Sequence, residues 1–310
     1  MEAIRQELIL RKDELSGIVE TIYFGGGTPS LLSLEELESI FETIHSNFVV
    51  SSDPEVTLEA NPDDLVSVEL PVEKRFQGYK SLGINRLSIG VQSFFQEDLE
   101  WMNRAHNASE ALESISEAKK YFDNITIDLI YGILDMSMER WEKNLEIAFS
   151  LDVPHLSCYA LTVEPRTALE NFIHKGKVAP IDDDLSFEHH KILIEKTALA
   201  GYDNYEFSNF GKPGYYSRNN SAYWEGKPYL GIGPSAHSYD GKTRSWNVEN
   251  NIKYIKSIEK GVLPSEAEHL SERDRYNEYV MTRLRTQTGI SIDFIEKEFG
   301  EEYLKYLFSQ

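Results

Sequence analysis

Cysteine is almost absent from this sequence, in which Cys158 is the only one among 310 residues. A single cysteine excludes the disulfide framework on which many small secreted domains depend. Unpaired thiols are typical of reducing compartments, so we expect the protein to be cytoplasmic.

The sequence also lacks long apolar runs and an excess of positive charge. No run approaches the roughly 20 apolar residues that span a bilayer, and the opening MEAIRQEL resembles an amphipathic helix fragment rather than a signal peptide. The net charge is −21, from 31 Lys and Arg against 52 Asp and Glu. Binding phosphate backbones needs clustered basic residues, so a general nucleic-acid binder is disfavoured. The net charge does not exclude a local basic pocket or a small anionic ligand.

What the sequence does contain is an alternation of short β-rich runs with longer helical patterns. We predict strands over Thr21–Gly27, Glu55–Asn61, Arg86–Gln92, Ile125–Gly132 and His155–Thr162, and helices over Leu34–Ser46, Ala108–Phe122 and Met138–Leu151. This spacing indicates βα units and a parallel sheet, either a barrel or a doubly wound sheet. Five strands are too few for a complete eight-stranded barrel.

The rhythm changes near Pro180. Beyond it, glycine- and aromatic-rich loops interrupt helical stretches at Leu185–Leu199, Val248–Lys260 and Glu272–Thr286. We therefore predict two regions, a βα region over 1–180 and a second, mainly α region over 181–310 that packs against the sheet.

Polar or glycine-rich segments follow successive predicted strands. The first strand ends in Gly25–Pro29, and the next three carry Glu59, Gln92 and Asp128 at or near their ends. In barrel-like βα folds, the loops at the carboxyl ends of the strands converge on one site. The set suits a zwitterionic ligand that contains a ribose. Glycine N–H groups and Thr28 would bind its carboxylate, Glu59 its ammonium group, and Gln92 and Asp128 its hydroxyls.

Each of these features also has a purely structural explanation. The glycines can form a tight turn, and Glu59, which precedes Asn-Pro, can cap a helix. Gln92 and Asp128 can satisfy backbone amides at the strand ends, and Arg104 can be a solvated charge on a helix. Because these features occur at successive strand ends, chance is a poor explanation for them, and a common site is favoured.

Several longer motifs carry a family resemblance. YFGGGTPS (23–30), LEANP (58–62), GINRLSIGVQSF (83–94), IDLIYG (127–132) and SCYALTVEP (157–165) resemble the radical S-adenosylmethionine (SAM) enzymes of the oxygen-independent coproporphyrinogen III oxidase family, the HemN/HemW type. RNNSAYW (218–224), YLGIGPSAHS (229–238) and NEYVMTRLRTQTGI (277–290) are similar to its haem-chaperone branch. The resemblance covers nearly the whole chain. It implies a partial (β/α)6 barrel with a C-terminal appendage.

The resemblance also implies roles for individual residues in binding SAM. Gly26, Gly27 and Thr28 would line the methionine moiety, with Glu59 beside them. The remaining implied contacts are Gln92 and Asp128 with the ribose, Arg104 on the carboxylate side and Ala160 beside the adenine. We assign no catalytic residue and no metal ligand in this chain.

The sequence departs from the family pattern in its cysteines. The family carries a C-x-x-x-C-x-x-C motif for a [4Fe–4S] cluster ahead of the glycine motif, whereas the 24 residues before Gly25 contain no cysteine. Cys158 alone cannot hold such a cluster. We therefore expect that the first barrel strand and the cluster loop are missing, and that these 310 residues do not cleave SAM reductively.

Two smaller departures concern a turn and a haem ligand. Ile133–Asp135 stands where the family usually has a proline after the glycine, which leaves the shape of that turn open. Asn219-Asn220 stands where the chaperone branch often has His-Asn. If that histidine binds haem in the family, His237 and Tyr223 are the candidate replacements in this chain.

We interpret the sequence as a haem chaperone that binds haem and SAM and delivers haem to a client protein. Clients in membranes would be contacted only peripherally. The aromatic surface Tyr215–Tyr239 is the predicted haem site. One alternative is a coproporphyrinogen III oxidase, which decarboxylates the propionates of a porphyrinogen. Another is a binding module without a cluster.

Overall fold

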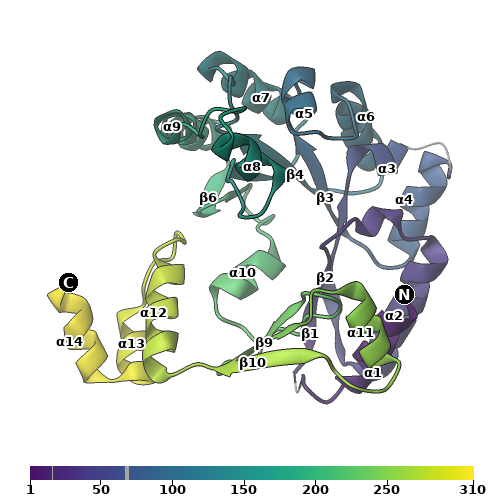
Figure 1. The fold of residues 1–310 in the computed structure, drawn as a ribbon, viewed down its shortest axis with the longest axis vertical. Coiled ribbons are helices and arrows are strands. Elements are labelled where there is room, and N and C mark those ends of the chain that lie inside the picture. The colour runs from purple at the N-terminus through teal and green to yellow at the C-terminus, as the bar shows by residue number, and fades with distance from the viewer. Residues whose placement is uncertain (16, 67–69) are drawn as a thin grey trace. The chain divides into compact units, whose positions relative to one another are not determined.

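A seven-stranded sheet carries the predicted alternation, with the strands in the order β1-β2-β3-β4-β5-β7-β6 (Figure 1). Strands β2 to β5 pair in parallel, while β7 pairs antiparallel with β5 and with β6. The parallel part curls as a partial barrel, so the predicted fold class is confirmed. Two short antiparallel strands extend the sheet beyond the five predicted strands.

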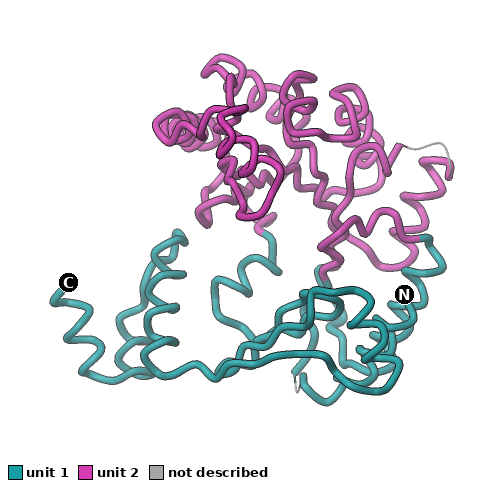
Figure 2. The backbone as a smooth tube through the Cα atoms, in the orientation of Figure 1, with its two compact units in different colours: residues 1–22, 33–55, 217–310 teal, residues 23–32, 56–216 magenta. Residues whose placement is uncertain are grey.

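In this computed structural model, which describes residues 1–15, 17–66 and 70–310, the chain divides into two compact units (Figure 2). Unit 1 comprises residues 1–22, 33–55 and 217–310, and unit 2 comprises 23–32 and 56–216. Strands β1 (Val19–Phe24) and β2 (Val50–Ala60) begin in unit 1 and end in unit 2. The predicted regions 1–180 and 181–310, and the missing first strand, stay predictions.

Unit 2 holds the rest of the large sheet and the helices that follow its strands. Its elements are η1 (Pro29–Leu31), α3 (Pro62–Val66), α4 (Val72–Ser81), β3 (Arg86–Gln92), α5 (Gln96–Trp101), α6 (Ala108–Ala118), β4 (Asn124–Tyr131), α7 (Met138–Ser150), β5 (His155–Ala160), α8 (Ala168–His174), α9 (Asp183–Leu199), β6 (Asp203–Glu206) and β7 (Asn209–Gly211).

The strands of unit 2 alternate between apolar and polar side chains. Leu87, Ile89 and Ile127 are fully buried, on the sheet face that packs against helices. Their neighbours Ser88 and Asp128 lie on the opposite face, because successive side chains of a strand point to opposite sides. The parallel part of the sheet thus has one apolar face and one face that carries polar side chains.

The predicted helix starts agree closely with the structure where a capping residue precedes the helix. The Ser33 side chain and Glu36 form a capping box at the start of α2 (Leu34–Asn47), which begins at the predicted residue, and the Asp182 side chain caps α9. The first strand is shorter than predicted, since it ends at Phe24. Gly26 and Gly27 then take left-handed φ angles of 71° and 72°, which do not continue a strand.

Unit 1 combines helices with a small antiparallel sheet of order β10-β9-β8. Its elements are α1 (Glu2–Leu10), α2 (Leu34–Asn47), α10 (Arg218–Trp224), β8 (His237–Tyr239), β9 (Thr243–Asn247), α11 (Asn251–Ile258), β10 (Ser265–His269), α12 (Glu272–Arg283), α13 (Ile292–Phe299) and α14 (Glu301–Ser309). An aromatic cluster around Tyr276 and Phe299 packs α12, α13 and α14 together.

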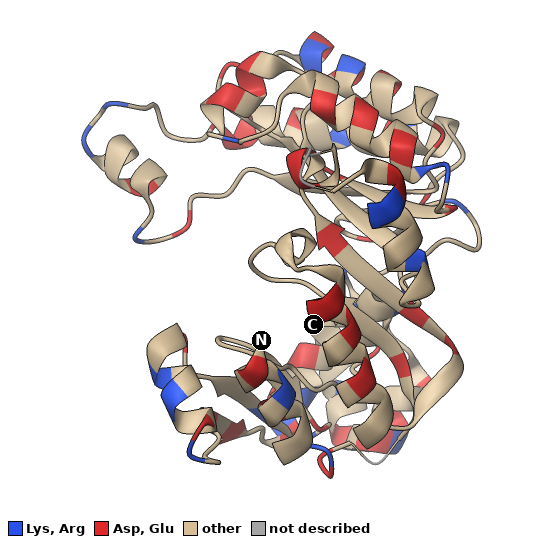
Figure 3. Ribbon diagram, turned by 90° about the vertical axis from the view of Figure 1, so that its right-hand side faces the viewer, with Lys and Arg blue, Asp and Glu red and all other residues tan. Residues whose placement is uncertain are grey.

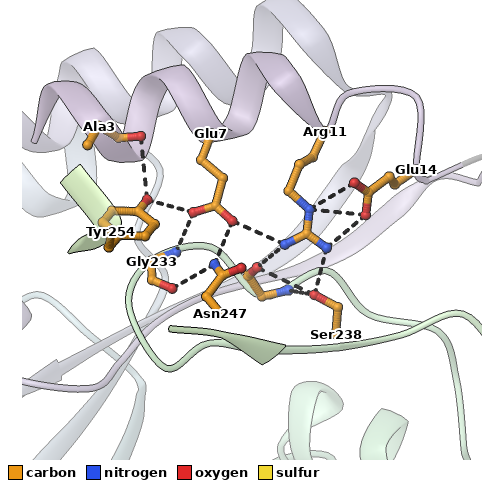
Figure 4. Close-up of polar contacts among 9 residues, drawn as sticks. Ala3, Glu7, Arg11, Glu14, Gly233, Ser238, Asn247 and Tyr254 are labelled. Carbon is orange, nitrogen blue, oxygen red and sulfur yellow. Dashed lines mark hydrogen bonds and ion pairs between the residues drawn. The ribbon is translucent and has the colours of Figure 1, made fainter. Parts of the chain in front are cut away.

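A buried carboxylate on α1 ties that helix to distant parts of unit 1 (Figure 4). Glu7, which is fully buried, accepts hydrogen bonds from Arg11 Nη1 at 3.1 Å and from the Gly233 N–H at 2.8 Å. Asn247 Nδ2 at 2.7 Å and the Tyr254 hydroxyl at 2.6 Å also donate to it. Four donors compensate the charge, so α1 is fixed by polar contacts as well as by packing.

Asp and Glu residues occur along many of the helices, with Lys and Arg residues among them (Figure 3). Within the described ranges, no helix is both long and apolar enough to cross a membrane.

Candidate functional site

The strand register of unit 2 brings the predicted site residues to one edge of the polar face. Glu59 on β2 pairs with Ser88 on β3, and Ser88 pairs with Thr126 on β4. Asp128 lies two residues beyond Thr126 and therefore on the same face, one step nearer the carboxyl end. Parallel strands end at a common edge, so these carboxylates lie near the glycine turn that follows β1.

The glycine turn holds the Glu59 carboxylate directly. The Gly26 N–H donates to Glu59 Oε2 at 3.2 Å, and the Tyr23 hydroxyl donates to Oε1 at 2.7 Å. A side chain at Gly25 is excluded, because its Cβ would lie 2.5 Å from Tyr23 Cε1 and 3.0 Å from Glu59 Oε1. The glycine run therefore serves close approach of backbone to a carboxylate, in addition to its turn.

Asp128 has a strongly perturbed acidity. Burial and the negative charge of Glu59 raise its pKa to about 7, although Arg86 and hydrogen bonds from Ser157 and Ser88 oppose the rise. The Ser88 hydroxyl donates to Asp128 Oδ1 at 3.4 Å. A carboxyl group that titrates near neutral pH can accept a hydrogen bond from a ligand hydroxyl or donate one to it.

Gln92 and Arg104 meet at the end of β3. Gln92 has a left-handed φ of 66°, and Arg104 Nη2 donates to Asn61 Oδ1 at 3.1 Å. A Cβ at Gly90 would lie 2.9 Å from Gln92 Nε2 and 3.4 Å from Arg104 Nη2. Both predicted side chains thus point over the same glycine. Arg104 thus belongs to a cluster with Asn61 and Gln92 and is more than a solvated charge.

The two other predicted contacts occupy strand and helix ends. Thr28 precedes η1, and its side chain does not cap that helix. Ala160 is the last residue of β5 and pairs with Tyr131 of β4. The ligand roles of both residues stay predictions.

Sequence reasoning missed Tyr23, Asn61 and Arg86. Tyr23 lies two residues before Gly25, so the period of a strand could have placed it on the same face. Arg86 is only 2% exposed, and its Nη2 donates to the Thr126 hydroxyl. Its positive charge acts on both Tyr23 and Asp128. The signal in the sequence was an arginine at the start of an apolar strand, because a charged side chain is buried there only if it is paired.

The single cysteine offers no metal centre. Cys158 is 2% exposed on β5, and burial together with the charge of Asp128 raises the pKa of its thiol. Over residues 1–15, 17–66 and 70–310, no three His, Cys, Asp or Glu side chains are grouped to hold a metal ion. These 310 residues therefore do not fit the cysteine triplet that a [4Fe–4S] cluster requires.

Unit 1 contains a separate aromatic surface. The ring of Tyr223 on α10 meets Tyr229 edge-on at 4.6 Å, and Tyr229 lies 6.3 Å from Tyr239 on β8. The guanidinium of Arg285 lies 5.6 Å above the ring of Trp224. Exposed His237 shares a face of β8 with Tyr239, since the two residues are two positions apart.

Comparison with known proteins defines first the class and then the family. The family described as the Radical SAM superfamily matches residues 1–148. The chain is 36% identical over 288 residues to the haem chaperone HemW of Bacillus subtilis, covering 92% of this chain and 73% of that protein. HemW of Mycobacterium tuberculosis H37Rv is 34% identical over 293 residues, with coverage of 94% and 74%.

The structure of coproporphyrinogen III oxidase (HemN) from Escherichia coli has the same fold. Its TM-score is 0.81 at 22% identity, over 98% of this chain and 72% of that one. The chain belongs to the HemN/HemW-type family of radical SAM proteins. That family implies SAM and a [4Fe–4S] cluster as cofactors.

Tyr23→Phe should lower the free energy of unfolding by up to about 1 kcal/mol, because it removes a partly exposed hydrogen bond to a charged carboxylate while keeping the ring beside Gly25. Urea unfolding measures the loss, and Tyr121→Phe elsewhere in unit 2 is the matched control. In a double-mutant cycle with Glu59→Gln, the two effects should not add. Additive effects would show that the Tyr23–Glu59 contact contributes nothing.

Proposed function

We propose that this protein is a haem chaperone, which holds haem and transfers it to a client protein. The observation that carries the proposal is the alignment of most of the chain with proteins named haem chaperones, at 36% identity to the one from Bacillus subtilis. A cytoplasmic location is part of the proposal, supported by the single unpaired cysteine. The protein would contact client proteins in membranes only peripherally.

The aromatic surface of unit 1 is the proposed haem site. Haem offers a large apolar plane, and the connected rings of Tyr223, Tyr229 and Tyr239 offer apolar area at low cost in side-chain entropy. Tyrosine and histidine both ligate haem iron in proteins, so Tyr223 and His237 are the candidate axial ligands. Asn219, at the position of the family histidine, already accepts a hydrogen bond from the Thr21 hydroxyl.

The strand-end site of unit 2 is proposed to bind SAM. Glu59 would accept the ammonium group, and the glycine turn with Thr28 would line the methionine moiety. Asp128 and Gln92 would bind the ribose, and Arg104 the carboxylate. These side chains suit the ligand, because the cationic Arg104 would meet its carboxylate, and the acidic Glu59 and Asp128 would meet its ammonium group and its ribose.

The residues of this chain do not fit a [4Fe–4S] cluster. It supplies the electron for reductive cleavage of SAM in the radical SAM family, and its thiolate ligands are not among these 310 residues. The proposed haem surface and the proposed SAM site both consist of residues that this chain does contain.

Haem titration tests the chaperone proposal. The chain should give a Soret shift with haem and no conversion of coproporphyrinogen III. Replacing Tyr223, Trp224 and His237 together with alanine should weaken haem binding about tenfold or more, because the aromatic contacts and both candidate ligands are lost. The single changes Tyr223→Phe and His237→Gln should show which residue is the ligand, since only the ligand's loss moves the Soret maximum.

The control for this titration is Glu59→Ala, which lies in unit 2 and should change haem affinity by less than about twofold. The proposal fails if the Soret shift does not exceed that of a bovine serum albumin control. It also fails if Glu59→Ala is as damaging as the triple change, because haem would then occupy the barrel, as expected for an oxidase.

A further inference from the structure

A missing side chain in the middle of β3 makes room for the polar ends of three others. Gly90 is buried, and a Cβ there would lie 2.9 Å from Gln92 Nε2, 3.4 Å from Arg104 Nη2 and 3.7 Å from Asn61 Oδ1. Glycine inside a strand weakens it, and its usual justification is the close approach of another group. In β3 the approaching groups are side chains of the proposed SAM site.

The backbone around Gly90 explains why these side chains converge. The pairing of β3 with β4 shifts register between Ile89 and Gln92. Gln92 then takes a φ of 66°, and its side chain folds back over Gly90. Arg104 follows α5, and its Nη2 donates to Asn61 Oδ1 at 3.1 Å.

Asn61 is itself held at the end of β2. Its backbone N–H donates to the Ser30 hydroxyl at 3.4 Å, and its carbonyl accepts from the Leu65 N–H at 3.3 Å. Ser30 in turn donates to Asp64 Oδ2 at 2.7 Å. The amide that receives Arg104 is therefore attached to an ordered strand end.

We propose that Asn61 and Gly90 are positioning residues for SAM, an inference that rests on the proposed function of the strand-end site. Asn61 fixes the guanidinium of Arg104 toward the carboxylate of the amino acid. Gly90 provides the space in which Arg104 and Gln92 lie side by side, so that Gln92 reaches the ribose. Arginine has many rotamers, and holding it in place before binding removes an entropic cost from the binding step.

The two residues should affect ligand binding differently. Asn61→Ala releases Arg104 alone, so it should weaken SAM about tenfold. It should leave 5′-methylthioadenosine, which lacks the amino-acid carboxylate, within about twofold of wild type. Gly90→Ala displaces both Arg104 and Gln92, so it should weaken both ligands about fivefold or more.

Stability separates this role from a merely structural one. The two atoms nearest the added Cβ at Gly90 are the ends of flexible side chains, which can move away. Gly90→Ala should therefore keep the urea midpoint of wild type while it loses affinity. Gly17→Ala is the matched control, since a Cβ there meets nothing within 4 Å, and it should change neither the midpoint nor the affinity.

Calorimetry on the 310-residue chain with SAM and with 5′-methylthioadenosine provides the test, with Glu59→Gln as the reference for the site. If Glu59→Gln weakens SAM but Asn61→Ala and Gly90→Ala bind like wild type, the positioning roles are wrong and the site stands. If Asn61→Ala weakens both ligands equally, Arg104 does not serve the carboxylate. If wild type binds neither ligand, or Glu59→Gln has no effect, the proposed SAM site fails and the inference fails with it.

Discussion

Glu7→Leu should lower the free energy of unfolding by about 3–5 kcal/mol, because it breaks a buried ion pair from one side. Glu7 is fully buried and receives four hydrogen bonds in Figure 4. Leucine fills a similar volume but accepts none of them. The donors of Arg11, Asn247 and Tyr254 would remain buried without this acceptor. Urea unfolding followed by tryptophan fluorescence measures the difference.

Glu14 provides a control on the same arginine. It pairs with Arg11 Nη2 at 2.7 Å, but its side chain is 46% exposed. Glu14→Leu should cost less than about 1 kcal/mol, because exposed ion pairs contribute little. Equal losses from the two substitutions would show that burial of Glu7 is not what makes its contacts important.

Asp128→Asn should reduce the pH dependence of stability. The folded-state pKa of Asp128 is raised from 3.8 to about 7, so the folded chain binds the proton more tightly than the unfolded chain. The resulting stabilisation is complete below about pH 4 and is lost as the pH rises through about 7. Asparagine has no proton to lose. The variant should therefore gain about 3–4 kcal/mol relative to wild type between pH 4 and pH 8.

Unfolding curves at pH 4, 6 and 8 provide the measurement. Exposed Asp123 directly precedes β4, the strand that carries Asp128. Asp123→Asn should give a plot of stability against pH that is parallel to that of wild type. Parallel profiles for Asp128→Asn as well would mean that Asp128 is not held in its protonated form by the fold. The expected gain also means that this proposed ribose contact lowers stability at neutral pH, as residues of functional sites often do.

Local signals in the sequence were enough to place most elements of the large sheet. Strand β3 coincides with the predicted Arg86–Gln92, since an apolar run lies between turn residues. The start of α2 follows from Ser33 and Glu36, whose capping box needs only residues three positions apart. These features depend on neighbours along the chain, and the sequence displays such neighbours directly.

Short strands in the second half of the chain were not predictable in the same way. Strand β10 has the sequence SEAEH and is exposed along its whole length, so it carries no apolar alternation. Strand β8 has only three residues. Both exist because they pair with β9, and backbone pairing with a partner strand leaves no pattern in such short polar segments.

The sequence by itself determined that acidic, amide and glycine groups follow successive strands, and parallel pairing is sufficient to bring such groups to one edge. Only the tertiary structure decided how these groups contact one another. Tyr23 lies 36 residues from Glu59, and Arg104 lies 43 residues from Asn61. These contacts depend on strand register, on the left-handed turn at Gln92 and on the absent side chain of Gly90. A hydrogen bond is lost when its donor and acceptor move about 1 Å further apart. Such pairs therefore follow from the assembled backbone and not from spacing along the chain.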